Sequence, residues 1–321
     1  MVTSKSILCI IISYNGEDYI EKCINSLYLS SINPDIICVD NNSFDSTVSK
    51  IKINFPNVKV FVNNQNQGFG QANNIGLSYT LENNYDFAFL LNQDAWVELD
   101  TIEKLVKNSL ERPEFGILSP IHLNGRGDNI DFHFSNYVNE IRCKGLISDF
   151  ILERPRKEVY ELPFVNAAAW LITKTCIQQI GGFDPLFFHY GEDDNYCQRA
   201  IFHGFKIGII PEVKIFHDRN QDYVYTYLFH DLKNFDRVVK PKLADINKDF
   251  YFEFRKQKRE LDSFIFYSII DLKIRRAIKL FKFRSHLMKM KKKIKRSIEI
   301  NKKIGTNYLN ESINFHSYSK L

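Results

Sequence analysis

The amino-acid sequence predicts an α/β domain, built on a doubly wound, helix-covered sheet, and a mainly helical extension behind it. Apolar runs without polar alternation recur through the first ninety residues, as in strands that are buried on both faces. Polar residues follow each of these runs. Beyond about Gln221, aromatic and basic residues interleave at helical spacing, and glycine is absent until Gly305. The length of 321 residues fits two units, which we place at residues 1–220 and 221–321.

The first ninety residues are predicted to form strand, helix, strand, strand and strand, at Ile7 to Ile12, Tyr19 to Leu29, Ile36 to Val39, Val58 to Val62 and Phe87 to Leu91. Asp45 or Ser46 is a candidate cap for a further helix. Apolar residues at helical spacing predict a helix from Glu98 to Leu110, which Pro113 ends.

The next segment, from Pro120 to Glu161, has no clear apolar periodicity. We interpret it as an irregular or antiparallel insertion that faces the substrate side of the domain. Ala167 to Ile172 resumes an ordered segment, and Asn195 to His203 is a predicted helix with Gly204 at its carboxyl end.

Composition and charge narrow the class of protein. With 44% hydrophobic and 25% charged residues, the chain is typical of a folded globular protein. The six cysteines form no CxxC pair, so neither a disulfide framework nor a zinc site is indicated. No apolar run approaches the ~18 residues of a membrane span, and the first residues do not resemble a signal peptide. We therefore expect a cytoplasmic protein, with peripheral contact at the inner face of the cytoplasmic membrane as an option.

The polar residues that follow the predicted strands are candidates for a ligand site. They include Ser13 and Asn15, Asp40 and Asn42, the segment 63–68, and Asn92 and Asp94. Ligands of open α/β sheets bind where loops leave the carboxyl ends of the strands. Asn and Asp also form turns, which is the alternative interpretation.

Three acidic or imidazole positions are candidates for chemistry. Asp94 offers a hard oxygen ligand for Mg²⁺ or Mn²⁺, or it caps the helix near Glu98. Glu192, Asp193 and Asp194 follow an aromatic segment, where burial and mutual repulsion would raise a carboxyl pKa toward that of a general base. The same acids suit a helix N-terminus. His217 follows an apolar run and is either a structural residue or a ligand.

Taken in order, these segments resemble the family 2 glycosyltransferases, which have the GT-A fold, and within them the bacterial rhamnosyltransferase-like branch. The resemblance covers about Ser6 to His217. It rests on the sequences ISYN at 12–15, VDNNS at 39–43, NQGFGQANNIG at 66–76, LNQD at 91–94, GFD at 182–184 and FFHYGED at 187–193.

The resemblance implies an inverting transfer of a sugar from a nucleoside-diphosphate donor, with dTDP-rhamnose as the leading donor, to a saccharide or a lipid-linked acceptor in surface polysaccharide synthesis. It implies that Asp193 is the base with Glu192 in support, and that Asp94 and His217 reach the metal, Mg²⁺ or Mn²⁺. The predicted donor contacts are Ser13, Asn15, Asp40, Asn42, Gly68, Asn73 and Asn92. Asn92 departs from the first Asp of the usual metal motif, so Asp94 becomes more important.

The basic extension lies outside the resemblance. Fourteen Lys and Arg residues oppose Asp271 and Glu299 within residues 271–303. Their interleaving with Ile278, Leu280, Phe281, Phe283, Leu287, Met288, Met290 and Ile294 suits an amphipathic helix on an anionic membrane, or a solvated charged helix. No motif of a nucleic-acid reader accompanies it, so nucleic acid is not expected as a partner.

Two other functions remain open at the level of sequence. Asn92 is compatible with a sugar-nucleotide-binding protein of impaired catalysis. A nucleotidyltransferase would use similar acids, but no Gly-rich, basic loop for a triphosphate occurs near the N-terminus.

Overall fold

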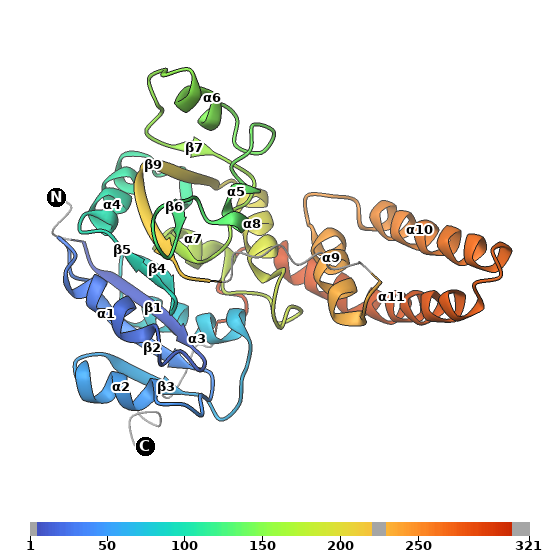
Figure 1. The fold of residues 1–321 in the computed structure, drawn as a ribbon, viewed down its shortest axis with the longest axis horizontal. Helices are drawn as coiled ribbons and strands as arrows, with labels where there is room; N and C mark the ends of the chain where they lie inside the picture. Colours follow the sequence, from blue (N-terminus) through green and yellow to red (C-terminus); the bar gives the residue numbers. More distant parts are fainter. Residues whose placement is uncertain (1–4, 220–228, 310–321) are drawn as a thin grey trace.

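The computed structural model describes residues 5–219 and 229–309, which form a sheet domain and a projecting set of helices (Figure 1). The strands are β1 Ile7–Ser13, β2 Asp35–Asp40, β3 Lys59–Val62, β4 Phe87–Asn92, β5 Ala95–Val97, β6 Phe115–Asn124, β7 Tyr160–Glu161, β8 Ala169–Thr173 and β9 Lys206–His217. The helices are α1 Ile20–Tyr28, α2 Thr47–Asn54, α3 Phe69–Glu82, α4 Thr101–Glu111, α5 Phe132–Ser135, α6 Leu146–Ile151, α7 Lys174–Ile180, α8 Glu192–Phe202, α9 Leu232–Ala244, α10 Phe250–Ile270 and α11 Ile274–Asn301.

One mixed sheet runs through the domain in the order β3-β2-β1-β4-β8-β6-β9-β5, with β7 paired to β9. The first four strands of this order are parallel, whereas β8 is antiparallel to both β4 and β6. Consequently β1, β2 and β4 end at the same edge of the sheet. Their last residues, Ser13, Asp40 and Asn92, lie in adjacent strands there, so the predicted gathering of polar residues is confirmed.

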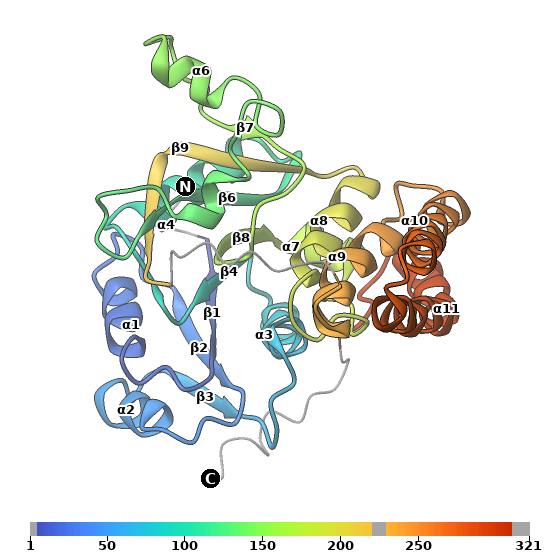
Figure 2. The same ribbon diagram turned by 45° about the vertical axis from the view of Figure 1, so that its right-hand side comes forward.

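Helices cover both faces of the sheet, which explains the uninterrupted apolar strands. Leu8 and Ile10 of β1 pack into one core with α3, α7 and α8, whereas Cys9 and Ile11 pack into a second core with α1, α2 and α4. Figure 2 shows α1 and α2 on one side of β1–β3 and α3 on the other. A strand between two apolar layers buries alternate residues on opposite faces. The predicted α/β architecture is confirmed.

Two parts of the fold differ from the sequence-based expectation. Helix α3 was absent from the predicted order of elements, because it is buried nearly all round and carries small or polar residues such as Asn73, Asn74 and Ser78 at buried positions. Its apolar periodicity is therefore weak. The segment from Pro120 to Glu161 is not wholly irregular: β6 extends through Pro120 to Asn124, and short helices α5 and α6 follow.

Helices α1, α2, α4 and α8 begin at or near the positions that the sequence predicts, whereas α7 was not predicted. The Asp45 carboxylate accepts a hydrogen bond from the backbone N–H of Thr47 at the start of α2 (3.0 Å). Helix α4 begins at Thr101 with Asp100 as its N-cap, so Asp94 does not cap it. Helix α8 begins at Glu192, three positions before the predicted start, and Gly204 follows its end with φ +87°.

Beyond the sheet domain, α9, α10 and α11 share a third apolar core, which also takes in Phe187. The expected helical character of this part of the chain is confirmed. Asp184 accepts hydrogen bonds from Ser297 (2.5 Å) and from the Asn301 side chain (2.8 Å), so the end of α11 is fastened to the loop before α8. The proposed boundary between residues 220 and 221 lies outside the described residues.

Within the ranges 5–219 and 229–309, no helix combines the length and the apolar character that crossing a bilayer requires.

Candidate functional site

The first part of the site is a buried carboxylate where β1 and β2 end. Asp40 is fully buried, and its Oδ2 accepts hydrogen bonds from the hydroxyls of Ser13 (2.7 Å) and Ser43 (2.6 Å). Its Oδ1 accepts a third hydrogen bond from the Ser43 backbone N–H (2.8 Å). Three donors offset the cost of burying the charge. Asp40 and Ser13 therefore hold together the two loops that carry Asn15 and Asn42, two of the predicted donor contacts.

These two loops adopt left-handed turns that suit Asn. Asn15 has φ 49° and Asn42 has φ 69°, and Asn tolerates this region better than most residues. The Asn15 backbone N–H donates to Ser43 Oγ (2.9 Å), and its Oδ1 accepts from the Phe44 backbone N–H (3.1 Å). Asn42 is exposed.

Two aromatic side chains that the sequence analysis did not single out line the same edge. Tyr14 is 43% exposed and Phe44 is 83% exposed, and their rings meet edge to face at 6.4 Å. Gln93, from the end of β4, exchanges two hydrogen bonds with the Tyr14 backbone. The loops after β1, β2 and β4 are thus joined into one surface. A sequence signal for this pair would have been their position directly beside Ser13 and Ser43.

The glycine-rich segment before α3 meets the loop that carries the acids. Gly68 has φ +81°, and a Cβ placed on it would lie 1.9 Å from the carbonyl oxygen of Phe188. A Cβ on Gly70 would touch Phe183 and Glu192. Asn73 is buried and donates from Nδ2 to the Phe69 carbonyl (3.0 Å). The glycines permit this close approach of backbone to backbone.

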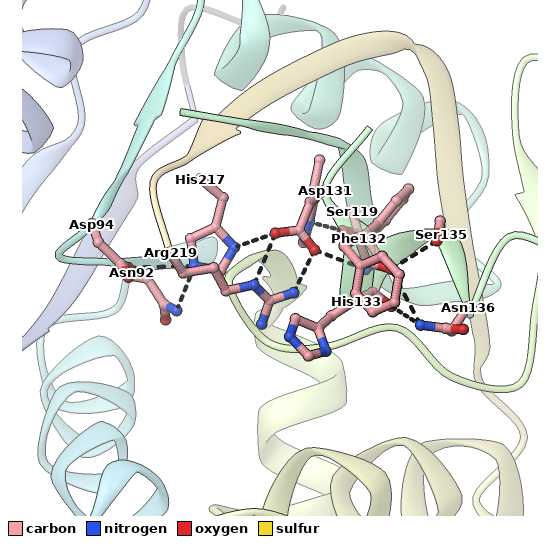
Figure 3. A network of polar contacts seen from close by, with 12 residues as sticks. Asn92, Asp94, Ser119, Asp131, Phe132, His133, Ser135, Asn136, His217 and Arg219 are labelled. Carbon is pink, nitrogen blue, oxygen red and sulfur yellow. Dashed lines mark hydrogen bonds and ion pairs between the residues drawn. The ribbon is translucent and has the colours of Figure 1, made fainter. Parts of the chain in front are cut away.

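Asn92, Asp94 and His217 converge on one point at the edge of the sheet (Figure 3). His217 Nε2 lies 3.3 Å from Asp94 Oδ1 and 3.4 Å from Asn92 Nδ2. The cause is sheet register, because β5 pairs with β9 so that Ala95 lies opposite His217. The His217 ring is 1% exposed, whereas the Asp94 side chain is 25% exposed. The structure therefore brings together the two residues predicted to reach a metal.

An ion pair between the buried Asp131 and the partly buried Arg219 lies next to His217. Asp131, at the start of α5, receives hydrogen bonds from Arg219 Nε (2.8 Å) and Arg219 Nη2 (2.5 Å), and its Oδ2 lies 3.8 Å from His217 Nδ1. Burial by itself would raise the pKa of Asp131, but the Arg219 hydrogen bonds and charge outweigh it and hold that pKa well below its usual range. Sequence reasoning missed Asp131, since it lies in the poorly patterned segment.

The acid cluster forms the first turn of α8, as the alternative interpretation expected. Burial, followed by the charge of Asp193, raises the pKa of Glu192 to about 8. Burial and the same charge raise the pKa of Asp194 to about 7, and burial raises that of Asp193. Among the described residues nothing donates a hydrogen bond to the buried Glu192 Oε2, which suits a protonated carboxyl.

Side chains of the segment around α5 share an electrostatic environment with both groups. Burial and then the charge of Asp193 raise the pKa of Tyr137 to about 12, while Arg219 opposes this. Burial and then Arg219 lower the pKa of His133, which also senses Arg237 and His217. The guanidinium carbon of Arg237, from α9, lies 3.9 Å from the centre of the Tyr190 ring. The charge of Arg237 opposes the rise in the pKa of Glu192, Asp193 and Asp194. Tyr137 and His133 thus each lie within electrostatic reach of Arg219, and Tyr137 also of the Asp193 charge.

The residues present fit a divalent cation shared with a bound diphosphate. Asp94 and His217 offer a carboxylate and an imidazole at one point, and no group of three or more acidic, His or Cys ligands occurs within residues 5–219 and 229–309. Mg²⁺ characteristically takes one or two carboxylates together with substrate phosphates, rather than a full set of protein ligands. A partial set of ligands at a partly exposed carboxylate meets that description.

Comparison with known proteins places this site in a family. Residues 8–180 match the model of glycosyl transferase family 2. The dTDP-rhamnosyl transferase RfbF of Shigella flexneri is 24% identical over 220 residues, covering 67% of this chain and 69% of RfbF. The N-acetylglucosaminyl-diphospho-decaprenol L-rhamnosyltransferase of Mycobacterium tuberculosis is 23% identical over 235 residues. The match covers 65% of this chain and 74% of that enzyme.

Solved structures of low sequence identity share the fold. GalNAc-T7, crystallised with UDP, GalNAc and Mn²⁺, superposes with a TM-score of 0.57 at 16% identity, over 80% of this chain and 51% of GalNAc-T7. Residues 1–349 of TarS from S. aureus, in complex with UDP, superpose with a TM-score of 0.53 at 15% identity, over 92% of this chain and 90% of that fragment. With a family match over more than half of its length, this chain belongs to glycosyl transferase family 2 and has the GT-A fold.

Proposed function

We propose that this chain is an inverting, metal-dependent glycosyltransferase that moves rhamnose from dTDP-rhamnose to a saccharide or lipid-linked acceptor in surface polysaccharide synthesis. The rhamnosyl transferases among its relatives support the donor sugar. The diphospho-decaprenol in the name of the mycobacterial relative supports a lipid-linked acceptor. We place the reaction in the cytoplasm, at the inner face of the membrane where such acceptors are extended.

In this proposal Asp193 is the general base. The acceptor hydroxyl oxygen attacks the anomeric carbon, the bond from that carbon to the diphosphate oxygen breaks, and the hydroxyl proton passes to the Asp193 carboxylate. One displacement inverts the anomeric configuration, without a covalent intermediate. The Asp193 side chain is half-buried, and burial raises its pKa, as a base that works near neutral pH requires.

Glu192 supports this base by remaining neutral. A carboxyl whose pKa is about 8 stays largely protonated at pH 7, so it adds little repulsion to the ionised Asp193. It also packs against α3, where a Cβ on Gly70 would lie 3.4 Å from Glu192 Cβ. Glu192 thereby holds the first turn of α8, which carries Asp193, against the glycine-rich segment.

Asp94 and His217 would hold Mg²⁺ or Mn²⁺ together with the donor diphosphate. The cation would neutralise negative charge on the leaving diphosphate. Asn92 lies beside this point, with its amide nitrogen 3.4 Å from the same His217 Nε2 that would bind the cation. The Mn²⁺ and UDP in the GalNAc-T7 structure support this assignment.

The nucleoside would lie on the surface joined by the loops after β1, β2 and β4. Asn15 and Asn42 offer amide groups at its rim, and the exposed rings of Tyr14 and Phe44 offer apolar faces for the base. Ser13 and Asp40 fix the loops from beneath. Gly68 would lie beside the donor at the start of α3, whereas the buried Asn73 would support this turn through its hydrogen bond to the Phe69 carbonyl.

The observation that carries this proposal is the convergence of Asp94 and His217 at one point, in a domain that also holds an acid cluster with raised carboxyl pKa values. To test it, the protein is incubated with a panel of nucleoside-diphosphate sugars, with Mn²⁺ or Mg²⁺ and with saccharide and lipid-linked acceptors. We expect transfer or slow donor hydrolysis that stops when EDTA is added, fastest with dTDP-rhamnose. Donor binding without turnover of any donor would instead favour a binding protein, and release of pyrophosphate would favour a nucleotidyltransferase.

A further inference from the structure

The turn between the two longest helices forms an exposed apolar end, which we call the hairpin tip and define as residues 264–281. It comprises the end of α10, a short turn and the start of α11, and it projects away from the sheet domain (Figure 1). Its exposed large apolar side chains are Phe264, Phe266, Tyr267, Ile269, Ile270, Leu272, Ile274, Ile278 and Phe281. Leu272, at the turn, is 82% exposed. A concentration of this kind marks an interaction surface in soluble proteins.

The exposed set is distinct from the core of the hairpin. Leu261, Ile265 and Leu280 are buried in the apolar core shared by α9, α10 and α11. The same core takes up Phe283, Leu287, Met290 and Ile294, so most apolar residues of the predicted membrane helix face neighbouring helices instead. The exposed apolar residues are therefore most concentrated at the tip, although Met288 on α11 and Tyr251 and Phe252 at the start of α10 are exposed as well.

Basic side chains surround these apolar residues. Lys273, Arg275, Arg276 and Lys279 lie within the tip, against a single acid, Asp271. Asp271 is itself paired with Lys273 (2.9 Å).

A groove along the outer face of α10 continues the same character toward the sheet domain. Phe252, Arg255, Lys256, Arg259, Phe264 and Tyr267 line it, together with Glu260 and Ser263. Aromatic and basic side chains in alternation are typical of surfaces that lie at the boundary between headgroups and acyl chains.

We propose that the hairpin tip docks on an anionic lipid bilayer, with its apolar residues in the interface and its basic residues on the headgroups. The positive charge favours an anionic occupant and opposes a second copy of this chain, because two tips would repel each other. The number of exposed apolar side chains favours a bilayer over a wholly polar partner. This inference goes beyond the proposed transferase function and does not depend on it, since docking requires neither donor nor metal.

The test uses the full chain and sedimentation with two kinds of vesicle, phosphatidylcholine alone and phosphatidylcholine mixed with phosphatidylglycerol. We expect binding to the anionic vesicles that weakens as salt is raised. Arg275→Glu with Lys279→Glu should lower the partition coefficient by about twenty-five-fold or more, since each basic residue near the surface contributes roughly fivefold. Ile270→Ser with Leu272→Ser should lower it by about tenfold.

Matched controls carry the same substitutions on the exposed surface of the sheet domain. They are Lys107→Glu with Lys144→Glu for charge and Ile53→Ser with Leu99→Ser for apolar area. We expect both controls to bind as the parent protein does, and circular dichroism verifies that all variants are folded.

A second measurement reports insertion directly. The two native tryptophans, Trp96 and Trp170, are buried in the sheet domain, so Ile270→Trp adds a reporter at the tip. With anionic vesicles we expect a blue shift and quenching by brominated acyl chains in Ile270→Trp, and neither effect in Ile53→Trp. The proposal is overturned if anionic vesicles are not bound, if the tip variants bind like their controls, or if Ile270→Ser with Leu272→Ser abolishes a dimer instead.

Discussion

His217 Nε2 lies 3.3 Å from Asp94 Oδ1, although the two residues come from segments far apart in the sequence. The pairing of β5 with β9 sets this contact, because Ala95, next to Asp94, lies opposite His217. The Asp218 backbone N–H also donates to the Asp94 carbonyl (2.8 Å), so the backbones are joined on both sides of the imidazole. Sheet register, and not a flexible loop, thus determines where the proposed metal ligands meet.

Removing either of these side chains should weaken metal-dependent donor binding. Asp94→Asn and His217→Ala each remove one of two protein ligands, so we expect turnover to fall by about a hundredfold or more. Isothermal titration of dTDP with and without Mn²⁺ measures the binding part of this loss. His230→Ala is the control, because His230 is exposed and lies outside the site. Equal Mn²⁺ dependence in His217→Ala and in the parent would show that His217 is structural.

Asp131 should stabilise the fold as well as orient His217. Asp131→Asn leaves Arg219 without its buried carboxylate and weakens the start of α5, where Asp131 accepts from the Phe134 backbone N–H (2.8 Å). Breaking a buried ion pair costs about 3 kcal/mol, which urea denaturation measures. Asp131 Oδ2 lies 3.8 Å from His217 Nδ1, so Asp131→Asn also removes a negative charge near the imidazole, and we expect weaker metal binding. Because the pKa of Asp131 is held low, its stabilising effect should be present above about pH 4 and be lost as the pH falls below that.

The control for this experiment is the double variant Asp131→Asn with Arg219→Gln. A buried pair in which each partner compensates the other predicts that the double variant is more stable than the sum of the two single changes implies. Strict additivity would mean that the two side chains do not act as a pair.

Glu192 should make the stability of the fold fall as the pH rises. Its pKa is raised from 4.5 to about 8 in the folded chain, so the folded state binds the more protons between these values. The free energy of unfolding therefore decreases through this window, by an amount on the order of a few kcal/mol. Denaturation at pH 5, 7 and 9 measures the slope. Glu192→Gln should flatten it, whereas Glu114→Gln, at an exposed position, should leave it unchanged.

Gly68 should tolerate no side chain, because both its backbone and its surroundings exclude one. At φ +81°, alanine costs about 1 kcal/mol, and its Cβ would collide with the Phe188 carbonyl. Gly204 has φ +87° but nothing within 4 Å of a Cβ, so Gly204→Ala isolates the backbone cost. We expect thermal melting to show a clearly larger loss for Gly68→Ala, accompanied by lower turnover. Equal losses would mean that the contact between the glycine-rich segment and the acid loop is unimportant.

The sequence was sufficient to predict the central strands and the edge where the site lies. Runs such as Ile7 to Ile12 are distinctive because both faces of these strands are covered, and parallel strands necessarily end together. Helix α3 escaped prediction because Asn73 and Asn74 are buried in it, where hydrogen bonds to the Phe69 and Phe183 carbonyls replace water. Because these buried residues are polar, the sequence shows no apolar pattern that would indicate a buried helix face.

The contacts between individual site residues could be predicted less well from the sequence. Asp94 and His217 could be proposed from their positions after strands, but the contact between them depends on the register of β5 against β9. Asp131 and Arg219 had no sequence signal that joined them, since a buried ion pair leaves no periodic pattern. On α11, alternating apolar and basic residues predicted amphipathicity, but which apolar side chains are exposed depends on how α9 and α10 pack against it.

The most direct test of the account compares Asp193→Asn with Glu192→Gln in one assay of sugar transfer and donor binding. We predict that Asp193→Asn abolishes transfer, by a factor of about a thousand, while the dissociation constant for dTDP with Mn²⁺ stays within about twofold. Glu192→Gln should retain transfer and leave the pH profile close to that of the parent below about pH 8, because the amide replaces a carboxyl that is already largely neutral there. Full transfer by Asp193→Asn would contradict the assignment of the base and with it the proposed mechanism.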